Sequence, residues 1–240
     1  MLSWRHCIFY LVIVCCLVTG TRDAFSETLS YRISWQSIPA GTATLSFIEH
    51  GEKALIELNA RSLPVMNAIY PVRTHVESEI SAISGLPHRY FKRSKEGWGS
   101  EKTGEILFDR ERYVATVYKN GRVERMLSIP PDTYDPISCL YFYRKIPELG
   151  GKPVQLTLTD GKKISTGVAT VLRKETIEIA AGRFNTLVVE PKMEGLTGVF
   201  QKSPKSSIIV WLTDDERRLP VKLKSEVIVG AFTAEAVAIQ

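Results

Sequence analysis

The sequence is poor in cysteine, and its four cysteines are unevenly placed. Cys7, Cys15 and Cys16 fall within the first 16 residues, and only Cys139 lies in the rest of the chain. An exported protein with a single cysteine has no internal disulfide, so burial of a core has to stabilise the fold. Cys139 lies in an apolar stretch, which favours a buried, inert thiol over a reactive one.

Local motifs for catalysis and metal binding are also missing. The sequence contains no HExxH, no CxxC and no carboxylate–histidine cluster, so we expect neither a metal nor a cofactor. It has no G-x-S-x-G elbow, no S-x-x-K and no glycine-rich phosphate loop. Because catalytic triads assemble from distant segments, an enzyme with a dispersed site stays as a third alternative. The acidic run Asp214–Glu216, followed by two arginines, predicts an exposed hairpin turn rather than a catalytic carboxylate pair.

No strong excess of charge is present, with a formal net charge of +5 over 240 residues. This balance suits solubility and predicts no nucleic-acid or other polyanionic partner. Basic and aromatic residues mix in Arg89–Arg93, followed by Lys95. We interpret this stretch as a strand with a solvated cationic face, with contact to anionic envelope lipid as the alternative.

The long apolar run lies close to the N-terminus, over Cys7–Val18. Twelve residues are too few for a membrane span and the right number for the core of a signal peptide. The small-x-small sequence Ala24-Phe25-Ser26 predicts cleavage between Ser26 and Glu27. We therefore expect residues 1–26 to be a signal peptide and the mature protein, 27–240, to be periplasmic or otherwise exported, without an integral membrane span.

Lipidation at Cys15 or Cys16 is the alternative at this end of the chain. Lipoprotein signals require a small residue directly before the modified cysteine. Val14 precedes Cys15, and Cys15 itself precedes Cys16. A lipid anchor is therefore the less favoured interpretation.

Tight-turn signals recur along the mature chain between strand-like runs. They are His50-Gly51-Glu52, Asn120-Gly121, Asp160-Gly161 and Ala181-Gly182-Arg183. Asn-Gly and Asp-Gly are typical of type I′ hairpin turns, which need φ > 0 at both central residues. The runs alternate with period two, as in Tyr31-Arg32-Ile33 and in Val154–Thr159, which predicts strands with one buried and one wet face. About fourteen strands are expected, in a barrel, a sandwich or a spiral sheet.

Helix is scarce in this pattern. Asp135 is a good N-cap, Pro136 suits the first helical position, and an apolar face continues to Arg144, so we predict a helix over 135–145. A second short helix or apolar loop is expected over Pro64–Tyr70. We expect the Ser62–Pro71 segment, which contains it, to plug the open end of the sheet, with a movable lid as the alternative. The predicted fold is mainly β: a single antiparallel curved sheet, as an open barrel, spiral or half-barrel, with one or two short helices.

The order of several stretches resembles the exported bacterial proteins grouped as domain of unknown function (DUF) 3108. The matching stretches are Tyr31–Gly41, Tyr70–Ser78, Asp135–Arg144, Ala181–Pro191, Val210–Lys222 and Gly230–Ala234. Where the family often has a small residue after DPxS, this chain has Cys139. The resemblance covers nearly the whole mature chain and implies secretion and a β-rich fold, which is similar to that of periplasmic lipoprotein carriers. It implies no established activity, so no catalytic residue is carried over.

These observations favour a non-enzymatic envelope protein whose sheet encloses an apolar interior. The first hypothesis is a module that binds a lipid or acyl chain between the sheet and the helix at 135–145. The alternative is a structural or assembly factor that binds another envelope protein. The candidate ligand-binding residues are Trp35, Met66, Tyr141, Phe142 and Trp211. Aromatic and methionine residues more often fill an ordinary core, which is the competing interpretation of all five.

Overall fold

The computed structural model describes residues 25–193, 207–227 and 230–240. Nearly all of the predicted signal peptide, including Cys15 and Cys16, lies outside these residues. The strands are β1 (Phe25–Trp35), β2 (Ile38–His50), β3 (Lys53–Ser62), β4 (Val72–Ser81), β5 (Pro87–Glu96), β6 (Lys102–Asp109), β7 (Val114–Lys119), β8 (Arg122–Ser128), β9 (Thr133–Tyr134), β10 (Val154–Thr159), β11 (Ile164–Ile179), β12 (Gly182–Met193), β13 (Ile208–Thr213), β14 (Pro220–Val227) and β15 (Gly230–Ile239). The helices are α1 (Pro64–Asn67) and α2 (Ser138–Arg144).

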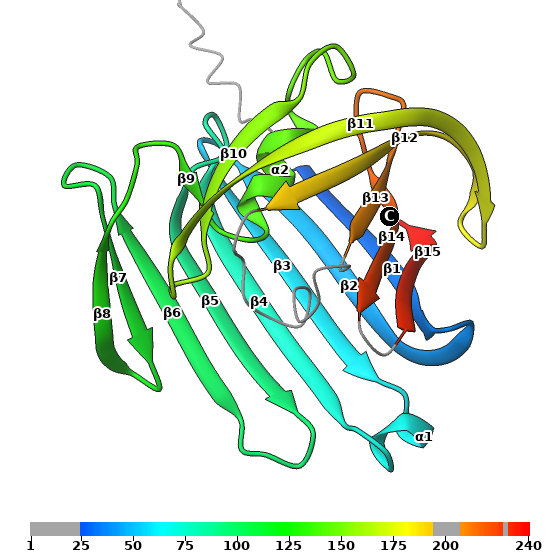
Figure 1. The fold of residues 1–240 in the computed structure, drawn as a ribbon, viewed down its shortest axis with the longest axis horizontal. Helices are drawn as coiled ribbons and strands as arrows, with labels where there is room; N and C mark the ends of the chain where they lie inside the picture. The colour runs from blue at the N-terminus through cyan, green and yellow to red at the C-terminus, as the bar shows by residue number, and fades with distance from the viewer. Residues whose placement is uncertain (1–24, 194–206, 228–229) are drawn as a thin grey trace, which may run out of the picture.

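All fifteen strands belong to one sheet, in the order β8-β7-β6-β5-β4-β3-β2-β1-β15-β14-β13-β12-β11-β10-β9 (Figure 1). This confirms the predicted single curved antiparallel sheet, with one strand more than expected. Every neighbouring pair is antiparallel except β9 and β10, which run parallel. The first and last strands pair at the middle of the sheet, where Leu29 lies opposite Ile239. The sheet therefore consists of two strand meanders, β1–β8 and β9–β15. The chain passes from the first to the second between β8 and β9, which are the outermost strands of the sheet.

The glycine turns lie where the sequence predicts them. Asn120 (φ 48°) and Gly121 (φ 77°) connect β7 and β8, so both central residues have the positive φ of a type I′ turn. The Asp160-Gly161 turn is different, because only Gly161 has positive φ and four residues separate β10 from β11. The type I′ prediction is therefore wrong at that turn.

The period-two pattern holds in β1, where Tyr31 is buried and Arg32 is exposed. It does not hold in β10, where Thr157 and Thr159 are buried as well as Leu156 and Leu158. The Thr159 hydroxyl donates a hydrogen bond to the Lys163 carbonyl and accepts one from the Gly161 N–H. Its polar group is satisfied by the following turn, so burial of this side chain carries no large penalty.

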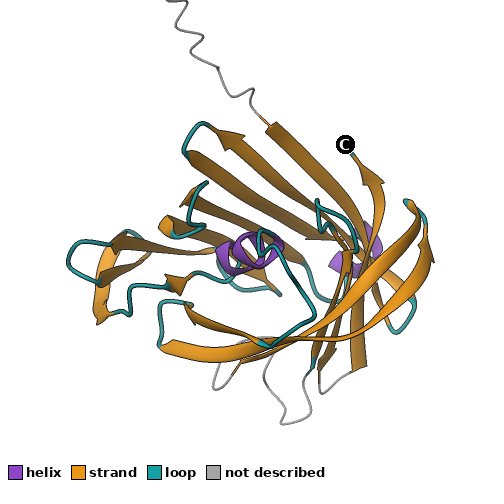
Figure 2. Cartoon of the chain, turned by 90° about the horizontal axis from the view of Figure 1, so that it is seen from above, coloured by secondary structure: helices purple, strands orange, loops and turns teal. Residues whose placement is uncertain are grey.

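Viewed from above, the sheet curls around α2 (Figure 2). Tyr141 of α2 belongs to a core cluster that includes Phe47 on β2 and Ile106 on β6. Tyr143 belongs to a second cluster with Leu187 on β12 and Leu212 on β13. The helix therefore fills one end of the curled sheet and contacts the inner faces of both meanders.

The two outer regions of the sheet also approach one another. An Arg125 guanidinium N–H on β8 donates to the Lys162 carbonyl in the β10–β11 turn, at 3.3 Å. A Cβ added to Gly161 in that turn would lie 3.1 Å from Val117 on β7. Glycine is needed there because the turn packs directly on the inner side of the other meander.

Helix α1 does not plug the sheet, so that prediction is wrong. Val65, Ile69 and Tyr70 are exposed, and no residue of α1 is buried. Four helical residues form a single turn between β3 and β4, which lies at the end of the sheet away from α2 (Figure 1). The segment is too short to reach back across the inner face.

Candidate functional site

The start of α2 is fixed to the sheet by Asp135, which is fully buried. One carboxylate oxygen accepts hydrogen bonds from the Ile137 and Ser138 N–H groups at 2.8 and 2.9 Å. The other oxygen accepts the Ser78 hydroxyl of β4 at 2.5 Å. Asp135 therefore caps the turn that leads into α2, whereas the helix itself starts at Ser138, three residues later than predicted, with Ile137 at its N-cap position. Burial raises the pKa of Asp135, while the hydrogen bonds from Ser78 and the two N–H groups oppose that shift.

The end of α2 is fixed by an ion pair inside the protein. The Arg144 guanidinium lies 2.5 Å from the Glu27 carboxylate of β1, and their side chains are 8% and 1% exposed. Arg144 also stacks on the Phe47 ring, with its Cζ 4.1 Å from the centroid. Arg217, which is half exposed, binds the second Glu27 oxygen at 3.1 Å. Glu27, Arg144 and Arg217 together form what we call the buried ion cluster.

The β13–β14 turn holds the same end of α2 by hydrogen bonds to the backbone carbonyls there. Asp215 accepts hydrogen bonds from the Arg217 and Arg218 N–H groups and from the Thr213 hydroxyl. Arg218 in turn donates to the carbonyls of Arg144 and Pro147. The acidic run is therefore a hairpin turn, as predicted, and its arginines bind α2 rather than only offsetting local charge.

A small cavity of about 160 Å³ lies beside the buried ion cluster. Glu49 on its wall binds the Lys145 amine at 2.7 Å and the Tyr141 hydroxyl at 2.9 Å. Partial burial acts to raise the pKa of Glu49, but these two hydrogen bonds prevail and lower it. Burial raises the pKa of Tyr141 above its ordinary value. Both groups are thereby held in their usual ionisation states at neutral pH, as in a structural contact.

The structure separates the five candidate ligand-binding residues. Tyr141 and Phe142 are neighbours on α2, but Tyr141 is buried against Phe47 and Phe142 stacks on Tyr134 with ring centroids 4.8 Å apart. Trp35 is half buried at the opposite end of β1. Since Tyr141 binds Glu49, which pairs with Phe25, roughly 30 Å of strand separates the two aromatic positions.

The other two candidates lie elsewhere again. Met66 is half buried on α1. Trp211 is buried on β13, where its indole N–H donates to Glu175 and the Lys222 amine lies 5.3 Å from its ring centroid. These five side chains do not form one constellation.

A different apolar surface lies on the inner face of the sheet, on the half away from α2. Ala43, Leu58 and Ala234 pack against the main core cluster but are only partly buried. Ala43 lies opposite Ala60, and Ala234 lies opposite Ile33. Small side chains from β15, β2 and β3, together with Ile33 from β1, thus line the inner face of these four adjacent strands. We call Ile33, Trp35, Ala43, Leu58, Ala60 and Ala234 the open inner face.

Polar chemistry elsewhere in the described chain is sparse. Cys139 is half buried rather than buried, and burial raises the pKa of its thiol to about 12. Such a thiol remains protonated at neutral pH and is a poor nucleophile. Among the described residues, no group of three or more His, Cys, Asp or Glu side chains is arranged to hold a metal ion.

The buried ion cluster was not predicted from the sequence. One signal was present: Arg144 falls on the helix face that also carries Ile137 and Tyr141, and a charge on an apolar face requires a partner. Glu27 gave no matching signal, because it lies 117 residues away and next to the predicted cleavage site.

Comparison with known proteins agrees with this architecture. A family model described as "Protein of unknown function (DUF3108)" matches residues 30–237. A solved beta-barrel-like protein of the domain of unknown function DUF1849 from Brucella abortus is similar, with a TM-score of 0.60 and 13% sequence identity. The match covers 90% of this chain and 97% of that chain, and at this identity it shows the fold alone. No curated protein matches the chain.

Proposed function

The chain belongs to the DUF3108 family, and from that premise we propose that it is an exported, non-enzymatic protein that binds an acyl chain on its open inner face. The observation that carries this proposal is the uneven burial of the inner face. Leu29 and Ile56 are fully buried near α2, whereas Trp35 and Leu58, on the same face, remain half exposed. An apolar surface that continues the core and stays partly open is suited to an apolar ligand.

The shape of the open inner face supports a chain-like ligand. Ala43 and Ala60 lie directly opposite one another, so the surface is low where two larger side chains would otherwise meet. Trp35 and Leu58 stand beside this low area. Because α2 fills the other end of the curled sheet, an acyl chain would enter from the end that carries α1.

Binding of cis-parinaric acid tests this function. We expect saturable binding by the purified protein. Ala60→Met should lower the affinity about tenfold or more, because the methionine side chain fills the low area and leaves the ligand less room and less apolar contact. Ala238→Met, at an exposed position of β15, is the matched control and should leave affinity unchanged. Equal affinity for Ala60→Met and the unchanged protein, with equal thermal midpoints, would contradict the proposal.

Export is the second part of the proposal, and it rests on the apolar run Cys7–Val18. No helix within the described ranges is long and apolar enough to span the membrane. We expect the protein isolated from its own envelope fraction to begin Glu-Thr-Leu-Ser, which N-terminal sequencing measures directly. A product that retains Met1, or one acylated at Cys15 or Cys16, would show that the predicted cleavage is wrong.

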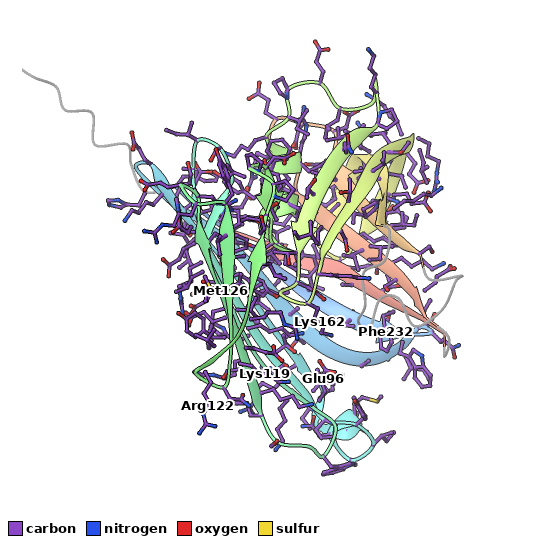
Figure 3. The ribbon with its side chains drawn as sticks, turned by 60° about the vertical axis from the view of Figure 1, so that its left-hand side comes forward. Glu96, Lys119, Arg122, Met126, Lys162 and Phe232 are labelled. Atoms are coloured by element: carbon purple, nitrogen blue, oxygen red, sulfur yellow. The ribbon has the colours of Figure 1, made fainter. Side chains whose placement is uncertain are left out.

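The edge strand β8 favours the alternative function, binding of another envelope protein. It ends one side of the sheet, where Figure 3 labels Met126, and its Val123 and Met126 side chains are exposed. An edge strand offers unpaired backbone groups to which a strand from a partner can add. A protein without saturable acyl binding would support this second function over the first.

A further inference from the structure

Exposed apolar side chains gather at the end of the sheet that carries α1. Ile38 follows the β1–β2 turn, Val65 and Ile69 belong to the β3–β4 connection, and Trp98 lies in the β5–β6 connection. Trp98 is 75% exposed and Ile69 is 69% exposed. We call Ile38, Val65, Ile69, Tyr70 and Trp98 the apolar rim.

Two of these connections are joined into one unit. The Gly97 N–H donates to the Pro71 carbonyl at 2.8 Å. A Cβ added to Gly97 would lie 2.8 Å from the Tyr70 ring, so the ring packs directly on this glycine backbone. Tyr70 and Trp98 are the sequence neighbours of Pro71 and Gly97, so this backbone hydrogen bond holds them on one unit.

A row of cations crosses the outer face of the sheet just inside this rim. Arg32 lies opposite Thr42, Thr42 opposite Arg61, Arg61 opposite Arg73, and Arg73 opposite Lys95. Four cations thus lie in one line across five neighbouring strands, over roughly 20 Å. We call Arg32, Arg61, Arg73 and Lys95 the basic row.

No acidic side chain among the described residues neutralises the basic row. None of its four side chains forms an ion pair with a residue in the described ranges. Glu235, opposite Arg32, binds Lys222 instead at 2.7 Å. By contrast Arg89, which lies near the start of β5 and away from Lys95, binds Glu77, Glu79 and Glu105. Like charges directly opposite one another destabilise a sheet, so this row costs stability, and no ion pair in the described parts of the chain offsets that cost.

The basic row borders a groove on the outer face. The groove has a volume of about 490 Å³, and its walls include Arg61, Arg73, His75 and Arg93. Arg93 has a distant acidic partner, Glu101, at 3.8 Å. Figure 3 shows Lys119 and Arg122 at the same end of the sheet as α1, which adds to the positive charge there.

We propose that the apolar rim and the basic row together dock this protein on an anionic lipid membrane. Apolar and aromatic side chains enter the headgroup region, and the cations behind them bind the phosphate groups of the lipids. This order of apolar tips followed by a cationic band matches the layers of a membrane surface. The charge of the row selects anionic lipid over other apolar partners. Docking does not depend on the proposed acyl ligand.

Flotation with lipid vesicles tests the docking surface. The purified protein is expected to bind phosphatidylglycerol/phosphatidylcholine vesicles and to bind pure phosphatidylcholine much more weakly, with binding reduced at about 0.5 M salt. Removal of two cations in R61Q/R73Q should lower partition about 25-fold, since each contributes a factor of roughly five near an anionic surface. I69S/W98S should lower partition more than about tenfold through lost apolar insertion.

Matched controls lie at the opposite end of the sheet. Ile83 is 74% exposed between β4 and β5, and Arg112 is exposed between β6 and β7. I83S and R112Q should leave partition unchanged. A blue shift of tryptophan emission on addition of anionic vesicles should occur in the unchanged protein and disappear in W98F.

Three results would overturn the proposal. These are no binding to anionic vesicles, equal binding to anionic and neutral vesicles, or equal losses for the rim variants and the controls. Thermal midpoints of all variants establish that they are folded. Since the changed side chains are exposed or unpaired, we expect those midpoints to stay close to that of the unchanged protein.

Discussion

Glu27→Ala is expected to lower the free energy of unfolding by about 3–5 kcal/mol, the cost of leaving one partner of a buried ion pair alone. Arg144 is only 8% exposed, and without Glu27 its charge stays inside the protein with the Phe47 ring and the Arg217 backbone carbonyl as its remaining contacts. Urea unfolding at constant pH measures the loss.

The control and the double variant make this prediction specific. Glu226→Ala removes a glutamate from an exposed pair with Lys224, and we expect it to change the unfolding midpoint little. Glu27→Ala/Arg144→Ala should be less destabilised than the sum of the two single variants, because it removes both charges. Strict additivity would show that the pair is not coupled and that the cluster is not an anchor of α2.

Asp135→Ala is expected to cost about 2–4 kcal/mol, more than a solvent-exposed helix cap. The change leaves the Ile137 and Ser138 N–H groups and the Ser78 hydroxyl without their acceptor in a fully buried place. Asp135→Asn keeps one acceptor oxygen for the two N–H groups, so it should recover most of the stability. Chemical denaturation of both variants is the measurement.

The pH dependence of Asp135→Asn gives a separate readout. Burial raises the pKa of Asp135 above its ordinary value of 3.8, so the folded chain retains this proton to a higher pH than the unfolded chain. The resulting stabilisation is fully present below the unfolded-state pKa and is lost as the pH rises through the folded-state pKa. Stability of the unchanged protein relative to Asp135→Asn should therefore fall as the pH rises from 3.8. A relative stability that rises over the same range would contradict the burial argument.

Much of the fold follows from local sequence. Alternation in β1 and the Asn120-Gly121 turn act over a few residues, and both were predicted because strand pleat and turn conformation depend on those residues alone. The side-chain hydrogen bonds of Asp135 to the following N–H groups obey a local rule of the same kind, although α2 starts three residues later than predicted. These local rules, taken with the family resemblance, led to a curved, mainly antiparallel sheet.

The features that were missed depend on contacts between distant strands. A cation is unremarkable in β1, β3, β4 or β5 taken alone, and only the register places Arg61 beside Arg73 and Arg73 beside Lys95. The partner of Arg144 was hidden in the same way. The segment at α1 was predicted to plug the sheet because its composition is apolar, but composition does not say which end of a strand a loop occupies.

The pairing of β1 with β15 has a consequence for folding kinetics. Most neighbouring strands in this sheet are consecutive in sequence, so each meander can grow through short-range hairpins. The central seam instead joins Leu29 to Ile239, across almost the full described length. Loop-closure entropy makes such long-range pairing slow. We therefore expect the two meanders to form first and the seam to close last, with β15 completing the sheet only once the whole chain is available.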